Sequence, residues 1–129
     1  MEPVDVVRRY LKTFETGDMA ELAAVVAEDV EIWGAGDHVS GRRYPEGAIT
    51  TPGLADCRLT IIELFAADDR VIVYFRTTYR HERTGNDVSQ TGLKMYQVAD
   101  GKIVRFWGET DLHGLLRQLG KVPAKFDFH

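Results

Sequence analysis

The chain contains a single cysteine, Cys57, among its 129 residues. One cysteine excludes an internal disulfide and a Cys-x-x-Cys motif for metal binding or redox chemistry. The chain also lacks any apolar run near the ~20 residues of a membrane-spanning helix, and its start, MEPVDVVRR, lacks the apolar stretch of a signal peptide. We therefore expect a cytoplasmic protein that has no membrane partner.

Basic residues are not in excess, because 16 Lys and Arg stand against 20 Asp and Glu, a formal net charge of −4. Nucleic acids are bound by clustered Lys and Arg, so this balance predicts no nucleic-acid partner. The glycines of GAG, RTGN and ADGK lie in no GxGxxG or P-loop context, which removes support for nucleotide binding. The four histidines, at positions 38, 81, 113 and 129, do not have metal-ligand spacing, so we expect no metal site.

Hydrophobic residues make up 44% of the chain and charged residues 28%, as in an ordinary globular protein. We expect one domain over residues 1–129. Its first part is helical. Apolar residues at three- and four-residue steps predict a helix that begins near Pro3 and ends at Gly17. Asp18 followed by Glu21 has the spacing of a helix start, which predicts a second helix through Val26.

The rest of the chain predicts mainly strands. A short helix is expected at Glu46–Thr50 inside a loop-rich stretch, and another at Leu112–Leu119. The tail, with Phe126 and Phe128, is expected to fold back on the body. Asp100–Gly101 is the strongest hairpin signal. Helices followed by an antiparallel meander indicate an α+β domain. The expected strands are Glu28–Gly34, Arg58–Ala66, Arg70–Glu82, Asp87–Ala99 and Lys102–Thr110.

Side chains alternate between the two faces of a strand, and both faces of the predicted sheet carry large apolar groups. On residues 70–82, Val71, Val73 and Phe75 share one face, while Ile72 and Tyr74 share the other. The helices cover one face, so we expect a second copy of the chain to cover the other and form a homodimer. On the last strand, the residues predicted to share one face are Ile103, Arg105, Trp107, Glu109 and Asp111.

The order of elements and the segment GKIVRFWGETDLHGLLRQLG, residues 101–120, resemble the SnoaL-like polyketide cyclase branch of the NTF2-like superfamily. Within this segment, relatives often show a GKI, a tryptophan, an aspartate and an LL-x-QLG helix. Here Trp107 and Asp111 stand at the tryptophan and the aspartate. A weaker match is RVIVYFRTTYRHERTG, in which His81 stands at a histidine that relatives carry.

The resemblance implies a cone, in which a curved antiparallel sheet wraps around N-terminal helices and an apolar pocket, with a homodimer formed through the convex sheet face. It also implies an enzyme without metal or cofactor. In such enzymes an Asp at the position of Asp111 acts as general acid/base in an aldol-type cyclisation of a hydrophobic, oxygenated small molecule. The alternatives are a non-catalytic ligand-binding domain and an epoxide hydrolase of the limonene-epoxide hydrolase type, of whose Asp–Arg–Asp set only Arg105 and Asp111 are found.

From the residues alone, Asp111 has two interpretations. It is a good N-cap for a helix that begins at Leu112. It is also a carboxylate at the mouth of the expected pocket, where burial raises a pKa and cap hydrogen bonds lower it. A base that removes a proton beside a carbonyl has to be ionised and still basic, so the burial effect would have to be the larger. The two roles are compatible.

Other candidates surround this residue. Trp107 is expected to form a pocket wall and stack on a flat ligand. Arg105 is expected to pair in part with Glu109 and to contact a ligand oxygen, and His81 to act on or orient the substrate. Lys94 shares a face with Tyr96, and surface exposure is favoured over a role as oxyanion partner. Further binding candidates in the loop or the pocket lining are Asp37, His38, Tyr10, Trp33, Tyr79 and Tyr96.

Overall fold

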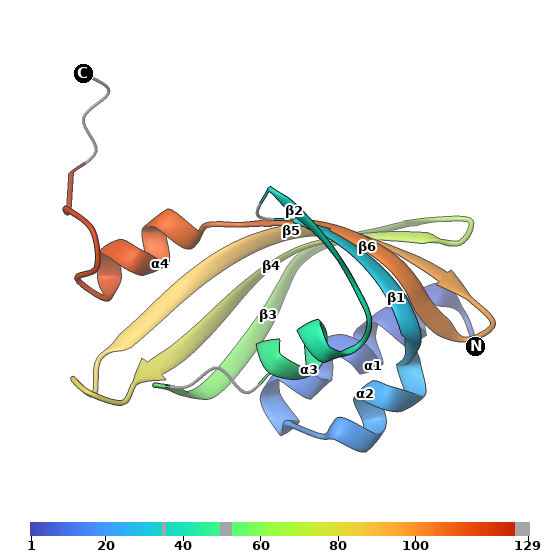
Figure 1. The fold of residues 1–129 in the computed structure, drawn as a ribbon, viewed down its shortest axis with the longest axis horizontal. Coiled ribbons are helices and arrows are strands. Elements are labelled where there is room, and N and C mark those ends of the chain that lie inside the picture. The colour runs from blue at the N-terminus through green and yellow to red at the C-terminus, as the bar shows by residue number, and fades with distance from the viewer. Residues whose placement is uncertain (35, 50–52, 126–129) are drawn as a thin grey trace.

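A computed structural model of the protein describes residues 1–34, 36–49 and 53–125 and confirms the α+β class. Within these residues a curved six-stranded sheet has the order β2-β1-β6-β5-β4-β3. Helices α1, α2 and α3 gather at one end of the molecule, and α4 lies at the other (Figure 1). The elements are α1 (Pro3–Thr16), α2 (Met19–Val25), β1 (Val26–Gly34), β2 (Asp37–Ser40), α3 (Arg43–Ala48), β3 (Leu54–Ala67), β4 (Arg70–His81), β5 (Asp87–Ala99), β6 (Lys102–Thr110) and α4 (Leu112–Gln118).

The predicted starts and ends of the first helices are confirmed. Gly17 ends α1 in the left-handed region, φ 67°, and its N–H donates to the carbonyl oxygen of Thr13 at 2.8 Å. The Asp18 carboxylate accepts the N–H of Glu21 at 3.0 Å and so caps α2. The second helix ends one residue early, because Val26 already has extended backbone angles and pairs with β6. Only β1 and β6 pair in parallel among the described neighbours.

Three predicted segments differ from the structure. Strand β2 is not among the predicted strands; it is an edge strand that pairs antiparallel with β1. The short helix lies at Arg43–Ala48, and Thr50 lies outside the described residues. Strand β3 begins at Leu54, earlier than predicted, because its pairing with β4 continues past an irregularity as far as His81. Phe126 and Phe128 also lie outside the described residues.

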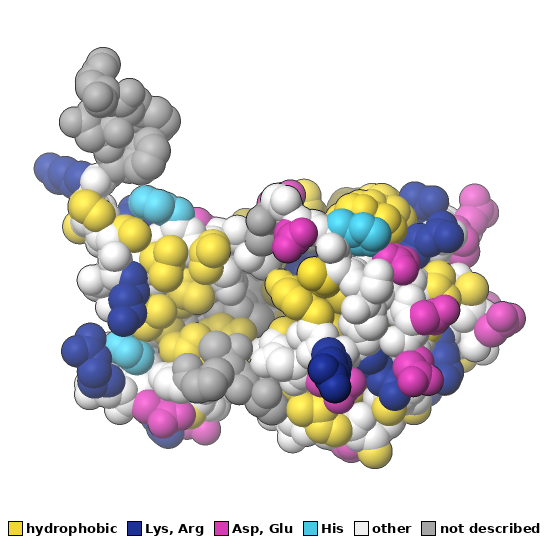
Figure 2. Space-filling model, viewed as in Figure 1, with side chains coloured by type: hydrophobic (Ala, Val, Ile, Leu, Met, Phe, Trp, Pro, Cys, Tyr) yellow, Lys and Arg dark blue, Asp and Glu magenta, His cyan; other side chains and the backbone are white. Residues whose placement is uncertain are grey.

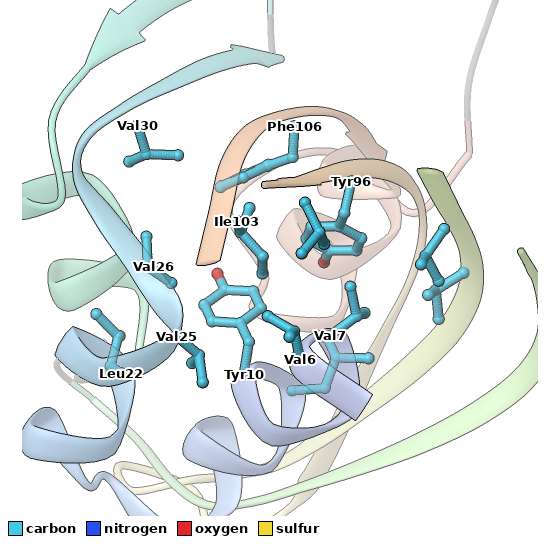
Figure 3. Close-up of a cluster of buried hydrophobic side chains, with 14 of the residues drawn as sticks. Val6, Val7, Tyr10, Leu22, Val25, Val26, Val30, Tyr96, Ile103 and Phe106 are labelled. Carbon is cyan, nitrogen blue, oxygen red and sulfur yellow. The ribbon is translucent and has the colours of Figure 1, made fainter. Parts of the chain in front are cut away.

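The core lies between α1, α2 and the concave face of the sheet, where burial of apolar side chains stabilises the fold. Figure 3 shows side chains of α1 and α2 directed toward those of β1, β5 and β6. The Tyr10 ring meets Tyr96 with a centroid distance of 5.8 Å, and Tyr96 meets Phe106 at 5.4 Å. Tyr10 is 1% exposed and Tyr96 is fully buried. Both were expected to line a pocket, but they lie in the closed core.

The alternation predicted for β4 is confirmed, because Val71, Val73 and Phe75 are buried while Ile72 and Tyr74 are exposed. The face predicted for β6 is wrong. Its register with β5 shifts, so that one extra residue, Val104, separates two pairs: Ile103 opposite Val98, and Arg105 opposite Gln97. A bulge of this kind reverses the alternation beyond it. Ile103 and Phe106 therefore both face the core, and the residues on the convex face are Arg105, Trp107 and Glu109.

Replacing Tyr96 with Phe is expected to stabilise the protein. The Tyr96 hydroxyl is enclosed and has no hydrogen-bond partner among the described residues. A buried polar group without a partner costs about 1–3 kcal/mol. Urea unfolding of Tyr96→Phe should show a gain on the order of 1 kcal/mol, whereas Tyr74→Phe on the exposed convex face should change little. An equal or lower stability for Tyr96→Phe would show that the hydroxyl is satisfied in solution.

Candidate functional site

On the concave face of the sheet, the rows of paired residues become less hydrophobic with distance from α1. The row of paired residues that packs on α1 is hydrophobic and buried: Val71, Tyr96, Phe106 and Ile32. The next row, toward α4, contains one charged residue and two glycines. We call it the lysine–glycine row, and its members are Val73, Lys94, Gly108 and Gly34. The row after that is Phe75, Gly92 and Thr110.

Lys94 lies flat on the concave face because of the glycine opposite it. A Cβ on Gly108 would stand 2.7 Å from Cγ of Lys94, so only glycine leaves room for the lysine stem. The Nζ of Lys94 lies 5.5 Å from the ring centroid of Phe106 and 5.7 Å from that of Phe75. Both rings belong to the core cluster. The ammonium group is therefore placed over two aromatic faces.

Among the described residues, Lys94 forms no ion pair and no hydrogen bond through its side chain. Burial alone lowers its pKa from the ordinary 10.5 to about 8. The residue as a whole is only partly enclosed. Lys94 was expected on the surface, and this expectation is wrong. The signal that could have placed it inside is the pair of nearby glycines, Gly92 and Gly108.

Asp111 follows β6 and caps α4, as one of its two interpretations predicted. Its Oδ1 accepts the N–H of Gly114 at 2.9 Å, and its own N–H donates to the carbonyl oxygen of Thr91 at 2.8 Å. The side chain is exposed. It lies three residues beyond Gly108, or ~10 Å along the strand from the lysine–glycine row.

Figure 2 shows that the molecule is hollowed between α3 and α4, with hydrophobic side chains on the α4 side.

His81 is the last residue of β4, and Tyr79 lies two residues before it. The Nδ1 of His81 is 3.1 Å from Oγ1 of Thr84 in the turn that follows the strand. Tyr79 is partly buried beside Cys57, and burial raises its pKa to about 12. Both residues belong to the concave side by alternation along β4, as predicted.

Trp33, Trp107 and His38 lie on the convex face, outside the cone in which a pocket was expected. Trp33 stacks between His38, at 4.6 Å and 2° between planes, and Trp107, at 5.1 Å and 10°. The Arg70 guanidinium lies 5.4 Å from the Trp107 ring centroid. Strands β2, β1 and β6 place these rings side by side because Trp33 pairs with both His38 and Trp107.

This stack borders a hollow of about 690 Å³ on the convex side, whose lining includes Trp33, Trp107, Ile72, Leu93 and Met95. Arg105, on the same face, donates to Oε1 of Gln97 at 3.5 Å. Because Arg105 faces away from the cone, the structure does not join it with Asp111 in the set of an epoxide hydrolase. Asp37 is exposed, and its Oδ1 accepts the N–H of His38 at 2.8 Å.

Comparison with known proteins identifies the family to which this chain belongs. The family model of the SnoaL-like domain matches residues 7–106. The chain belongs to the SnoaL-like family. Among solved structures, this SnoaL-like protein is similar to IdmH from Streptomyces antibioticus, which is provisionally assigned as a polyketide cyclase. The TM-score is 0.79 at 27% identity, covering 93% of this chain and 99% of IdmH.

Two further structures share the fold. AclR from Streptomyces galilaeus, provisionally assigned as a hydroxylase, has a TM-score of 0.81 at 22% identity over 94% of this chain and 97% of its own. A protein of ketosteroid isomerase-like fold from Catenulispora acidiphila has a TM-score of 0.77 at 17% identity over 98% and 99%. The predicted NTF2-like fold is thus confirmed. No curated protein matches the sequence.

No helix in residues 1–34, 36–49 and 53–125 is long and apolar enough to cross a membrane. In the same part of the chain, no three His, Cys, Asp or Glu side chains are grouped so as to hold a metal ion.

Replacing Lys94 with Met is expected to stabilise the protein at neutral pH. The pKa of Lys94 is about 8 in the folded chain and ~10.4 when unfolded. Between these pH values the unfolded chain binds more protons, so the contribution of Lys94 to stability rises with pH. Lys94→Met should gain on the order of 2 kcal/mol at pH 7, and this advantage should shrink as pH rises from 8 to 10.5. A difference that stays constant with pH in urea unfolding, as expected for exposed Lys102→Met, would contradict the burial of the amine.

Proposed function

We propose that this SnoaL-like protein is a cofactor-independent enzyme that moves a proton at the carbon beside a carbonyl group, as in an aldol-type cyclisation. Its substrate is a hydrophobic, oxygenated small molecule bound on the concave face. The observation that carries this proposal is Lys94, an amine without an anionic partner among the described residues, set against the apolar rings of Phe75 and Phe106. A hydrophobic carbonyl compound would place its apolar body against these rings and its carbonyl oxygen beside the Lys94 amine.

In this proposal one carbonyl of the substrate lies at Lys94, and the body of the substrate extends along the Phe75–Gly92–Thr110 row, so that a carbon beside a further carbonyl lies at Asp111. Asp111 is the general acid/base that accepts the proton and returns it. Gly92 makes room for the Phe75 ring on this face, because a Cβ there would stand 2.6 Å from that ring. Membership of the SnoaL-like family and the likeness to IdmH support the same class of substrate.

A non-catalytic ligand-binding domain is the second candidate, and the cap hydrogen bond of Asp111 favours it. That bond gives the Asp111 side chain a structural role that requires no chemistry. In this case the concave face would hold the same kind of ligand without turnover. The two candidates differ in whether proton exchange beside the carbonyl depends on the Asp111 carboxylate.

Asp111→Asn tests the catalytic role without removing the cap, since Asn caps a helix about as well as Asp. The rate of α-proton exchange of 4-phenylbutan-2-one and related ketones in D₂O, followed by proton NMR, should fall about 10²–10⁴-fold. The matched control is Asp18→Asn, which changes the same residue type at the N-cap of α2 and should exchange like the wild type. Exchange that is absent in the wild type, or unchanged in Asp111→Asn, would favour the binding domain.

We also propose that two copies of the chain pack through their convex faces. Large apolar side chains on β3, β4 and β5 remain exposed there: Phe65 is 62% exposed, Ile72 39%, Tyr74 38% and Leu93 53%. They are neighbours in the register, since Phe65 pairs with Ile72 and Tyr74 pairs with Leu93. An apolar surface of this kind is typical of an interface.

Leu93→Glu is expected to convert a dimer to a monomer, because it would bury a charge without a partner at the interface. Size-exclusion chromatography with light scattering measures this mass directly. Leu112→Glu is the control, since Leu112 is 50% exposed but belongs to α4. A wild-type chain that is monomeric at all concentrations would contradict the proposed assembly.

A further inference from the structure

We propose that Lys94 captures the carbonyl group of its ligand covalently, through Nζ, as an iminium ion. This inference rests on the proposed function in one respect, namely that a carbonyl compound binds the concave face. It goes further, because it assigns to Lys94 a bond to carbon rather than a charge beside an oxygen.

The first support is the placement of the amine. Gly108 leaves room for the stem of Lys94 to lie across the sheet, and the Phe75 and Phe106 rings fix the position of Nζ. An amine held in one place reacts with a bound carbonyl carbon more readily than a freely moving one. The chain has four other lysines, at positions 12, 102, 121 and 125. Lys12 and Lys102, which serve as comparisons, are exposed.

The second support is the absence of a counter-ion. Lys94 pairs with no carboxylate among the described residues, whereas Lys12 lies 3.3 Å from Oε1 of Glu15. An ammonium in apolar surroundings without a carboxylate is disfavoured relative to the neutral amine. With its pKa near 8, Lys94 is about half neutral at that pH. An ordinary lysine at the same pH is neutral in only roughly one molecule in 250. Only the neutral amine has the lone pair that attacks carbon.

The step balances with water as its only by-product. The Nζ lone pair attacks the carbonyl carbon to form a C–N bond, and a proton passes from the nitrogen to the carbonyl oxygen. A second proton from solvent then lets that oxygen leave as water, which gives the iminium ion. The positive nitrogen draws electrons from the neighbouring C–H bond, so that proton can pass to a water molecule and leave an enamine. The enamine carbon can attack a second carbonyl to close a ring, and one water molecule then hydrolyses the iminium and restores the amine.

Reductive trapping tests the capture without requiring turnover. The folded protein is incubated near pH 7 with benzaldehyde, which has no α-proton, and sodium cyanoborohydride, which reduces an iminium to a stable benzylamine. Mass-spectrometric peptide mapping then locates the label. We expect Lys94 to be labelled at least tenfold faster than Lys12 and Lys102. Labelling that follows exposure, with Lys94 slower than these two, would overturn the proposal.

The pH dependence of the labelling rate gives an independent readout. For Lys94 the rate should rise up to about pH 8 and then level off, following the pKa that burial sets. For a lysine with the ordinary pKa of ~10.4 the rate would instead continue to rise toward pH 10. In urea-unfolded protein Lys94 and Lys12 should become equal. A Lys94 profile that matches Lys12 in the folded protein would count against a reactive, desolvated amine.

Two variants separate a covalent role from a charge role. Lys94→Arg keeps the positive charge but cannot form the iminium, and Lys94→Met removes both. If Lys94 is the nucleophile, both variants should lose α-proton exchange of the ketone to the same extent, with Lys102→Met as the unaffected control. If Lys94→Arg retains exchange, the amine acts only by charge and the covalent role is overturned. Circular dichroism checks that each variant is folded.

The failure of this inference differs from a failure of the proposed function. Fast trapping at Lys94 without α-proton exchange would leave a carbonyl-binding amine in a protein that is not a proton-transfer enzyme. Exchange that depends on Asp111, with no trapping at Lys94 and full activity in Lys94→Arg, would support the enzyme and overturn the iminium.

Discussion

The structure depends on the contact between Tyr10 of α1 and the rings of Tyr96 and Phe106 on the sheet. Aromatic side chains bury large areas, so this contact fixes which face of the sheet is covered. It also limits the cover, because α1 and α2 pack on only part of the concave face. The lysine–glycine row lies at the margin of that packing, since Val73 still belongs to the core cluster while Lys94 and Gly108 are only partly buried. The candidate site is therefore the partly buried stretch of the concave face beside the core.

A single extra residue in β6 decides which side chains belong to this site. Without the bulge at Val104, alternation would turn Trp107 inward and place Gly108 and Phe106 outside. With it, the tryptophans are assigned to the convex face, and small residues lie opposite Lys94. Large aromatic groups on a sheet face usually suggest ligand binding or an interface. Here we propose the interface for them, while the glycines make room on the concave face for the Lys94 stem and the Phe75 ring.

Local signals in the sequence predicted local features well. The caps at Gly17, Asp18 and Asp111 and the alternation of β4 follow from short-range chemistry, and the structure confirms them. Strand β2 was missed because an edge strand in a glycine-rich hairpin needs no strong pattern of its own. The bulge has no local signature, since it exists only in the pairing of β5 with β6. Lys94 was placed on the surface because a lysine is seldom enclosed, and only its cross-strand partner Gly108 shows otherwise.

The stack of Trp33 on Trp107 has an optical consequence. These are the two tryptophans of the chain, so its indole fluorescence originates entirely from the convex face. Coupled indoles beside His38 should respond to events on that side, such as association of subunits. A ligand seated at Lys94 lies across the sheet from both emitters. A silent fluorescence titration would therefore not indicate an empty site, and binding there is better followed by signals that originate from the ligand itself.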